Sequence, residues 1–145
     1  MQDILTNKLY EYIRQNNPDV LIPLEENDSV TQYLKDKVDS IKDLLEQLQK
    51  ENTPAYIIAE VCMEALTKDL RPSKYNYIIN ILEQDFETVY PQLQELGTLL
   101  YEVVNMIAYC KSVFDSFGFT EEDEDNRQLK YGVAGAISEY LAKNQ

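Results

Sequence analysis

Histidine and tryptophan are absent from this chain of 145 residues, and glycine occurs only four times. Without histidine the chain lacks the usual general base at neutral pH, the usual partner of a serine or cysteine nucleophile and the commonest metal ligand. The few glycines fall inside or at the end of expected helices, so there is no glycine-rich phosphate loop and no G-x-S-x-G turn. We therefore expect no cofactor and none of the common hydrolase or nucleotide-binding mechanisms.

Cysteine is also scarce. Cys62 and Cys110 lie in separate apolar stretches and not in a C-x-x-C pair, which predicts two core residues and neither a disulfide framework nor a zinc site. The first eight residues lack the basic start and apolar run of a signal peptide, and no apolar stretch is long enough to cross a membrane. These features predict a cytoplasmic protein without membrane attachment.

Basic residues are half as frequent as acidic ones: 13 Lys and Arg against 26 Asp and Glu give a formal net charge of −13. A surface this negative repels nucleic acid phosphates and anionic lipids, so we expect no direct nucleic acid or membrane binding. Basic protein surfaces or cations are the expected partners. The alternative is that the charge serves solubility alone.

Apolar residues recur at helical spacing along nearly the whole chain, and strand-like alternation is confined to short stretches. The pattern predicts an all-α fold, a compact multihelical bundle of about six helices in a single domain spanning residues 1–145. The expected helices cover residues 3–15, 29–50, 54–68, 73 to at least 86, 92–116, and 120 or 126 to 143.

The helix expected over residues 92–116 is the most informative one. Its apolar residues, which include Leu96 and Leu100, cover most of the helix circumference, so it should lie at the centre of the bundle. At its end Gly118 should take a left-handed conformation, with Phe119 folding back onto Phe114. In the last helix Gly132 and Gly135 predict a close approach between helices.

A run of five acids, Glu121, Glu122, Asp123, Glu124 and Asp125, is the sharpest local feature. It lacks the central glycine and closing glutamate of a calcium loop. Two interpretations stay open: an acidic first turn at the start of the last helix, capped by Thr120 and favoured by the helix dipole, or a docking patch for a basic partner. Large amphipathic side chains off the apolar stripes are further candidates for a contact surface, namely Tyr10, Tyr77, Tyr109 and Tyr131.

Lys68, Arg71 and Lys74 form the one cationic cluster of the sequence, next to an expected helix start at Ser73. Backbone N–H groups at a helix start favour anions, so Arg71, Ser73 and Lys74 are the candidate anion contacts. The alternative is that these cations balance Glu64 and Asp69.

Acids one helical turn apart, Glu60 with Glu64 and Glu83 with Glu87, are the candidate ligands of a magnesium-dependent enzyme that uses carboxylates alone. Neither pair has the E-x-x-E and E-x-x-D spacing typical of all-helical nucleotide pyrophosphatases. Acids on the wet face of a helix more often contact only water.

Three islands of the sequence resemble one known family. The segment Leu70-Arg71-Pro72-Ser73-Lys74-Tyr75 resembles an L-x-F-S-K-Y/H-D core, Tyr12-Ile13 with Asn17-Pro18-Asp19 resembles its Y-L…H-P-E start, and residues 135–141 resemble its G-A-I-x-x-Y-L ending. The family is a helical Bacteroidetes family of unknown function. The resemblance implies a multihelical fold, no established activity, no catalytic residues and frequent association with mobile genetic elements.

Three functional hypotheses follow. The first is a non-enzymatic interaction or accessory protein that binds another protein or a second copy of itself. The second is an acidic antagonist that mimics DNA and occupies a nucleic-acid-binding protein. The third is the magnesium-dependent carboxylate enzyme.

Overall fold

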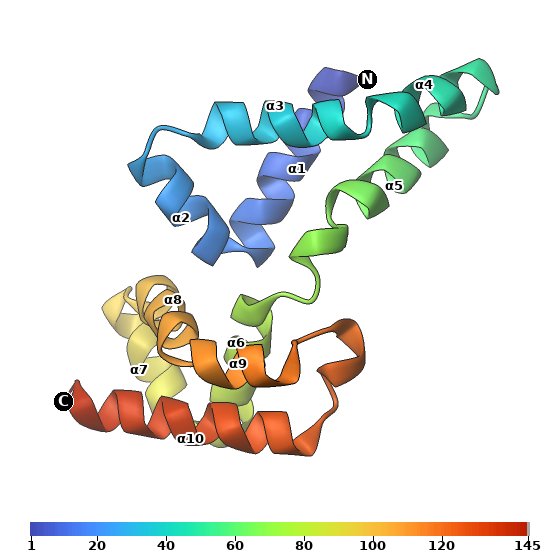
Figure 1. The fold of residues 1–145 in the computed structure, drawn as a ribbon. Coiled ribbons are helices and arrows are strands. Elements are labelled where there is room, and N and C mark those ends of the chain that lie inside the picture. The colour runs from blue at the N-terminus through green and yellow to red at the C-terminus, as the bar shows by residue number, and fades with distance from the viewer. Residues whose placement is uncertain (145) are drawn as a thin grey trace. The chain divides into compact units, whose positions relative to one another are not determined.

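The computed structural model describes residues 1–144, which form ten α-helices, two short 3-10 helices and no strand (Figure 1). The all-α prediction is confirmed, and the prediction of about six helices is wrong. The chain divides into two compact units, unit 1 (Met1–Arg71) and unit 2 (Pro72–Gln145). None of the helices within the described range is both long and apolar enough to span a membrane.

Unit 1 is built around its first helix. Its elements are α1 (Gln2–Asn16), α2 (Pro18–Glu26), α3 (Val30–Ser40), α4 (Lys42–Lys50), α5 (Ala55–Leu66) and the 3-10 helix η1 (Lys68–Leu70). Helix α1 packs against α2, α3 and α5. Its inward residues Leu5, Leu9 and Ile13 are fully buried at a spacing of four, which places them on one helix face.

Proline begins a helix where the sequence predicts a connector. Asn17 leaves helical geometry, and Pro18 then occupies the first position of α2. An N–H at this position makes no hydrogen bond within the helix, so proline, which lacks the N–H, costs no bond there. Pro23 lies inside this short helix. The connector containing Pro23 that was expected between the helices over residues 3–15 and 29–50 is therefore wrong, because Pro18 acts as a helix start as well as a helix stop.

The long helix expected over residues 29–50 is two helices. Ile41 (φ −110°, ψ 18°) separates α3 from α4, and its amide donates to the carbonyl of Val38 at 3.2 Å. Helix α3 packs on α1 and α2, whereas α4 packs on α5. The bend directs each half toward its own partners, with Leu34 and Leu45 buried on either side of it.

Unit 2 has a second core, built around α8. Its elements are α6 (Lys74–Asp85), α7 (Val89–Leu96), α8 (Leu99–Tyr109), α9 (Lys111–Phe117), the 3-10 helix η2 (Glu121–Asp123) and α10 (Arg127–Lys143). Helix α8 packs against α6, α7, α9 and α10. Val103, Met106 and Cys110 are fully buried along it and at its end.

The single central helix over residues 92–116 is wrong. Gly97 adopts a left-handed conformation (φ 71°, ψ 19°) and ends α7, with the amides of Gly97 and Thr98 donating to Gln94 and Leu93. This is the hydrogen-bond pattern that closes a helix at glycine. Cys110 then separates α8 from α9. A central position is correct for α8 within unit 2 alone.

Two local predictions in unit 2 are confirmed. Gly118 is left-handed (φ 71°, ψ 11°), and the Phe119 ring lies 4.8 Å from the Phe114 ring, centroid to centroid. Ser73 caps α6, because its hydroxyl accepts a hydrogen bond from the Asn76 amide at 3.0 Å. Both motifs depend on residues close in sequence, which is why the sequence alone reveals them.

The two glycines of α10 differ. A Cβ on Gly132 would lie 3.0 Å from Cγ1 of Val113, so α9 and α10 approach closely there, as predicted. A Cβ on Gly135 would meet nothing within 4 Å. The predicted close contact is therefore confirmed at Gly132 and wrong at Gly135.

Candidate interaction sites

The acidic run forms its own short turn. Glu121–Asp123 is the 3-10 helix η2, and one carboxylate oxygen of Asp123 accepts from both the amide (2.9 Å) and the hydroxyl (3.0 Å) of Thr120. Asn126 caps α10 separately, through its side-chain oxygen. The run is thus not the first turn of α10, and of its members Glu121, Glu122, Glu124 and Asp125 are exposed whereas Asp123 is half-buried.

Tyr77 is packed beside this run. Its ring lies edge-on to Phe114 (5.9 Å) and Phe119 (5.1 Å), and its hydroxyl oxygen is buried without a hydrogen-bond partner among residues 1–144. Burial raises the pKa of the Tyr77 hydroxyl, and the charge of Glu124 raises it further. The structure therefore brings Tyr77 and the acidic run together, with the Tyr77 ring serving an aromatic cluster.

The other tyrosine candidates have separate surroundings. Tyr131 is 70% exposed on α10, and no ring contact or hydrogen bond joins it to the acidic run within residues 1–144. Tyr109 donates to Glu139 at 3.2 Å, which links α8 to α10. Tyr10 is half-buried against the unit 1 core. Of the four, Tyr131 is the one with a ring open to a partner.

The three candidate anion contacts each serve a structural role. Arg71, the last residue of unit 1, pairs with Glu64 at 2.8 Å. Within unit 2, the Ser73 hydroxyl caps α6 and the Lys74 ammonium lies 5.4 Å from the centroid of the Phe114 ring. The balancing of Glu64 by Arg71 is confirmed. Anion contact by Arg71, Ser73 and Lys74 stays a prediction.

Asp69, the other acid expected to be balanced by this cluster, has a different partner. Lys37 of α3 pairs with Asp69 at 2.7 Å. The cation therefore comes from a helix distant in sequence, which spacing alone does not reveal.

The four carboxylates proposed for magnesium do not gather. Within residues 1–144 no three side chains of the Asp, Glu, Cys or His type lie close enough to hold a metal ion together. Glu60 and Glu64 belong to unit 1 and Glu83 and Glu87 to unit 2. Glu64 already pairs with Arg71.

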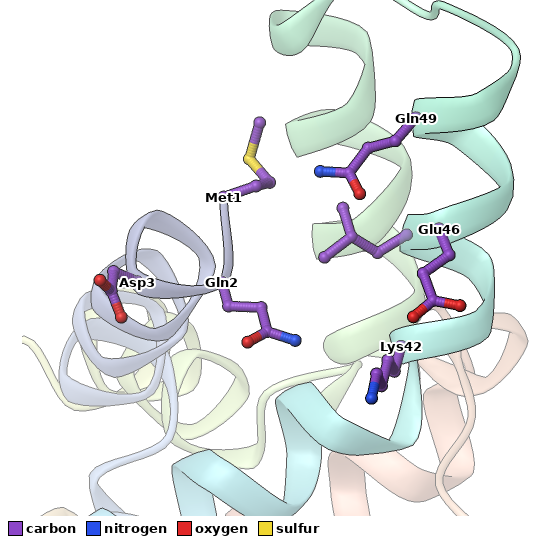
Figure 2. A pocket seen from close by; sticks show the side chains of 7 residues that line it. Met1, Gln2, Asp3, Lys42, Glu46 and Gln49 are labelled. Atoms are coloured by element: carbon purple, nitrogen blue, oxygen red, sulfur yellow. The ribbon is translucent and has the colours of Figure 1, made fainter.

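A groove of about 380 Å³ lies in unit 1, between the start of α1 and α4 (Figure 2). Its polar lining comes from Gln2, Lys42, Glu46 and Gln49, whereas the Asp3 carboxylate points away from this space (Figure 2). The lining residues are Met1, Gln2, Asp3, Lys42, Leu45, Glu46 and Gln49. Sequence reasoning missed this groove, because its two sides lie some 40 residues apart and share no motif.

Sequence reasoning also missed an exposed apolar corner at the junction of α7 and α8. Leu96 is 72% exposed, Leu100 37% and Tyr101 61%. Leu96 and Leu100 were expected to face inward on one continuous helix, and that expectation is wrong. Gly97 is the signal that could have corrected it, since a left-handed glycine ends α7 and starts α8 in a new direction.

These features define an all-helical protein of net charge −13, with exposed acidic and apolar side chains and no gathered metal-ligand set within residues 1–144. The chain belongs to the family described as Domain of unknown function (DUF1896), whose model matches residues 5–145 and so runs through both units. The resemblance to an uncharacterised domain family is thereby confirmed. No curated protein and no solved structure matches the chain.

Proposed function

We propose that this chain is a non-enzymatic interaction protein that binds a partner protein with a basic surface. The observation that carries the proposal is the exposure of Leu96, Tyr101 and Tyr131 on a protein of net charge −13. Exposed aromatic side chains supply large contact areas at interfaces, and charge of one sign speeds association with partners of the other sign.

The proposal includes a cytoplasmic location. Cys62 and Cys110 are both free and buried, which suits a reducing compartment. Burial raises the pKa of the Cys110 thiol to about 11, so this thiol is protonated and unreactive at neutral pH. An accessory role in a mobile genetic element is proposed from the resemblance at Leu70–Tyr75, and the genes that flank this one test it.

Affinity capture from a native extract tests the proposed function. Wild-type protein should retain a discrete protein, and raising the salt concentration should weaken its retention because the contact is partly electrostatic. Light scattering on the purified chain shows whether a second copy is the partner. If the chain is monomeric and retains no protein from the extract at low salt, the proposed function is wrong.

A DNA-mimicking antagonist is the second candidate, and the ordered acidic run favours it. The bonds between Thr120 and Asp123 hold the run in a defined turn, with Glu122, Glu124 and Asp125 exposed. The chain should then displace duplex DNA from a histone, and a variant with Glu122→Gln, Glu124→Gln and Asp125→Asn should displace less. Equal displacement by both proteins would eliminate the run as the mimic.

A further inference from the structure

We infer that the α7–α8 corner, defined as Leu96, Leu100 and Tyr101, is the docking site for a basic amphipathic segment of another protein. This inference rests on the proposed function and names the surface and the chemistry of the partner. The segment would place apolar side chains on the corner and Lys or Arg side chains around it.

The geometry of unit 2 leaves this corner open. Leu96 is the last residue of α7, and Leu100 and Tyr101 belong to the first turn of α8, all within six consecutive residues. Helix α7 contains no buried residue, and it meets the core only through half-buried side chains such as Tyr90 and Leu93. The apolar side chains at its end therefore have no cover in the described structure.

The two helices that form the corner, α7 and α8, contain acidic residues and no Lys or Arg. No Lys or Arg occurs between Lys74 and Lys111, the stretch that contains nearly all of α6 and the whole of α7 and α8. The acids of the same stretch are Glu83, Asp85, Glu87, Glu95 and Glu102. A partner segment would thus meet an apolar centre on α7 and α8, whose only charged side chains are acidic.

Cations that reach this stretch from α10 are already engaged. Lys130 lies 3.9 Å from Asp85, and the Lys143 ammonium sits 5.2 Å from the centroid of the Tyr109 ring. Glu102 accepts from the Tyr140 hydroxyl at 2.8 Å. Glu95, next to Leu96, is exposed, and residues 1–144 provide it with no ion pair.

The negative charge of these helices decides between two possible occupants of the corner, a second copy of the chain and a basic segment of another protein. A second copy would bring an equally negative set of helices against the first, and like charges across an interface oppose association. A segment with Lys or Arg beside its apolar residues gains from both features, since buried apolar anchors supply affinity and complementary charge speeds and orients the encounter.

Fluorescence anisotropy on the full chain tests the inference with a labelled helical peptide that carries Leu on one face and Lys on the other. Two matched peptides replace every Lys by Glu or every Leu by Ser. We expect the Leu/Lys peptide alone to bind. The double variant Leu96→Ser, Tyr101→Ser should weaken its binding by about tenfold, the size typical of losing interface anchors.

The control variant is Ile4→Ser, Tyr56→Ser, which removes two exposed apolar side chains from α1 and α5 of unit 1. Its affinity should stay within about twofold of wild type. Because all four positions are exposed, both double variants should keep the wild-type circular dichroism and melting temperature.

Five results would overturn the inference. Equal weakening by both double variants would mean non-specific adhesion, and equal binding of the Ser-for-Leu peptide would mean that charge alone is recognised. A dimer that Leu96→Ser, Tyr101→Ser dissolves would make a second copy the occupant. If wild type and the Leu96→Ser, Tyr101→Ser variant retain a partner protein equally well, this inference is wrong and the proposed function stands. If wild type retains no protein and binds no peptide, both are wrong.

Discussion

Units 1 and 2 are both built from helices alone, and their cores contain different kinds of side chain. Unit 1 buries aliphatic residues around α1, and none of its aromatic side chains is fully buried. Unit 2 contains ring pairs that join Tyr77, Phe114 and Phe119 in one cluster and Tyr109 with Tyr140 in another. Aliphatic side chains of similar volume can replace one another in the unit 1 core, whereas the aromatic clusters of unit 2 depend on specific ring orientations.

The units also differ in how helices end and in where cations lie. All four glycines fall in unit 2, and Gly97 and Gly118 end helices there with positive φ. In unit 1 the residues with positive φ are Asp28 and Asn52.

Unit 1 has 8 basic and 14 acidic residues against 5 and 12 in unit 2, so unit 2 has the lower share of cations. The exposed corner and the acidic run both belong to this cation-poor unit.

The largest expected effect is Phe114→Ala in unit 2. Phe114 is 1% exposed and joins two ring contacts, so its loss should reduce the free energy of unfolding by about 3–5 kcal/mol. Because the family match runs through both units, we expect one cooperative transition and hence loss of hydrogen-exchange protection in both. Leu9→Ala is the unit 1 control. If protection falls only in the mutated unit, the chain is two folding domains and the single-domain prediction is wrong.

The next effect is alkaline destabilisation through Cys110. Burial raises its pKa from 9.0 to about 11, so its contribution to stability is complete below pH 9 and is lost as pH rises through about 11. That contribution should amount to about 2–3 kcal/mol in urea titrations, and Cys110→Ala should remove it, while the part of the alkaline loss due to the raised pKa values of Tyr75, Tyr77 and Tyr140 should remain. In unit 1 burial raises the pKa of Cys62 less, so Cys62→Ala should change the alkaline loss less. If Cys110→Ala and Cys62→Ala change the alkaline loss of stability equally, the two units do not differ in the burial of their cysteines.

Tyr140→Phe should reveal the hydrogen bonds that unit 2 places between helices. The Tyr140 hydroxyl donates to Glu102 at 2.8 Å in a part-buried position, so its removal should destabilise the chain by about 1 kcal/mol. Denaturant unfolding measures the change. Tyr101→Phe, an exposed position on the same helix α8 that supplies Glu102, should have no measurable effect.

The smallest effects separate the two glycines of α10. Gly135→Ala should stabilise the chain by up to about 1 kcal/mol, because alanine favours the helix and nothing lies within 4 Å of its Cβ. Gly132→Ala should gain less, since its Cβ meets Val113 at 3.0 Å. The difference should vanish when Val113→Ala is also present. Equal gains in the wild-type background would show that α9 and α10 adjust freely at this point.

Sequence reasoning succeeded wherever a signal lies within a few residues. Ser73 as a cap, Gly118 as a left-handed helix end and the return of Phe119 onto Phe114 were predicted correctly. It failed at Pro18 and Gly97, each of which is compatible with more than one chain path. Pro18 can follow one helix and begin the next, and Gly97 can be tolerated within a helix or end it.

The candidate sites were predictable to a smaller extent. The acidic run could be located from the sequence, and its separation from α10 could not, because both Thr120 and Asn126 are good caps. The apolar corner was missed because Leu96 and Leu100 fit a helical stripe if residues 92–116 are one helix. One backbone angle at Gly97 changes the direction in which those side chains point.

The sequence by itself determined the helical class, the negative charge, the lack of histidine chemistry and the local caps. Each of these depends on composition or on residues within one or two helical turns. Only the tertiary structure decided that the chain has two cores, that α8 is central in one and α1 in the other, and that Leu96 and Tyr101 face outward. Helical periodicity defines which residues share a face, and only packing between distant segments decides whether that face meets the core or the solvent.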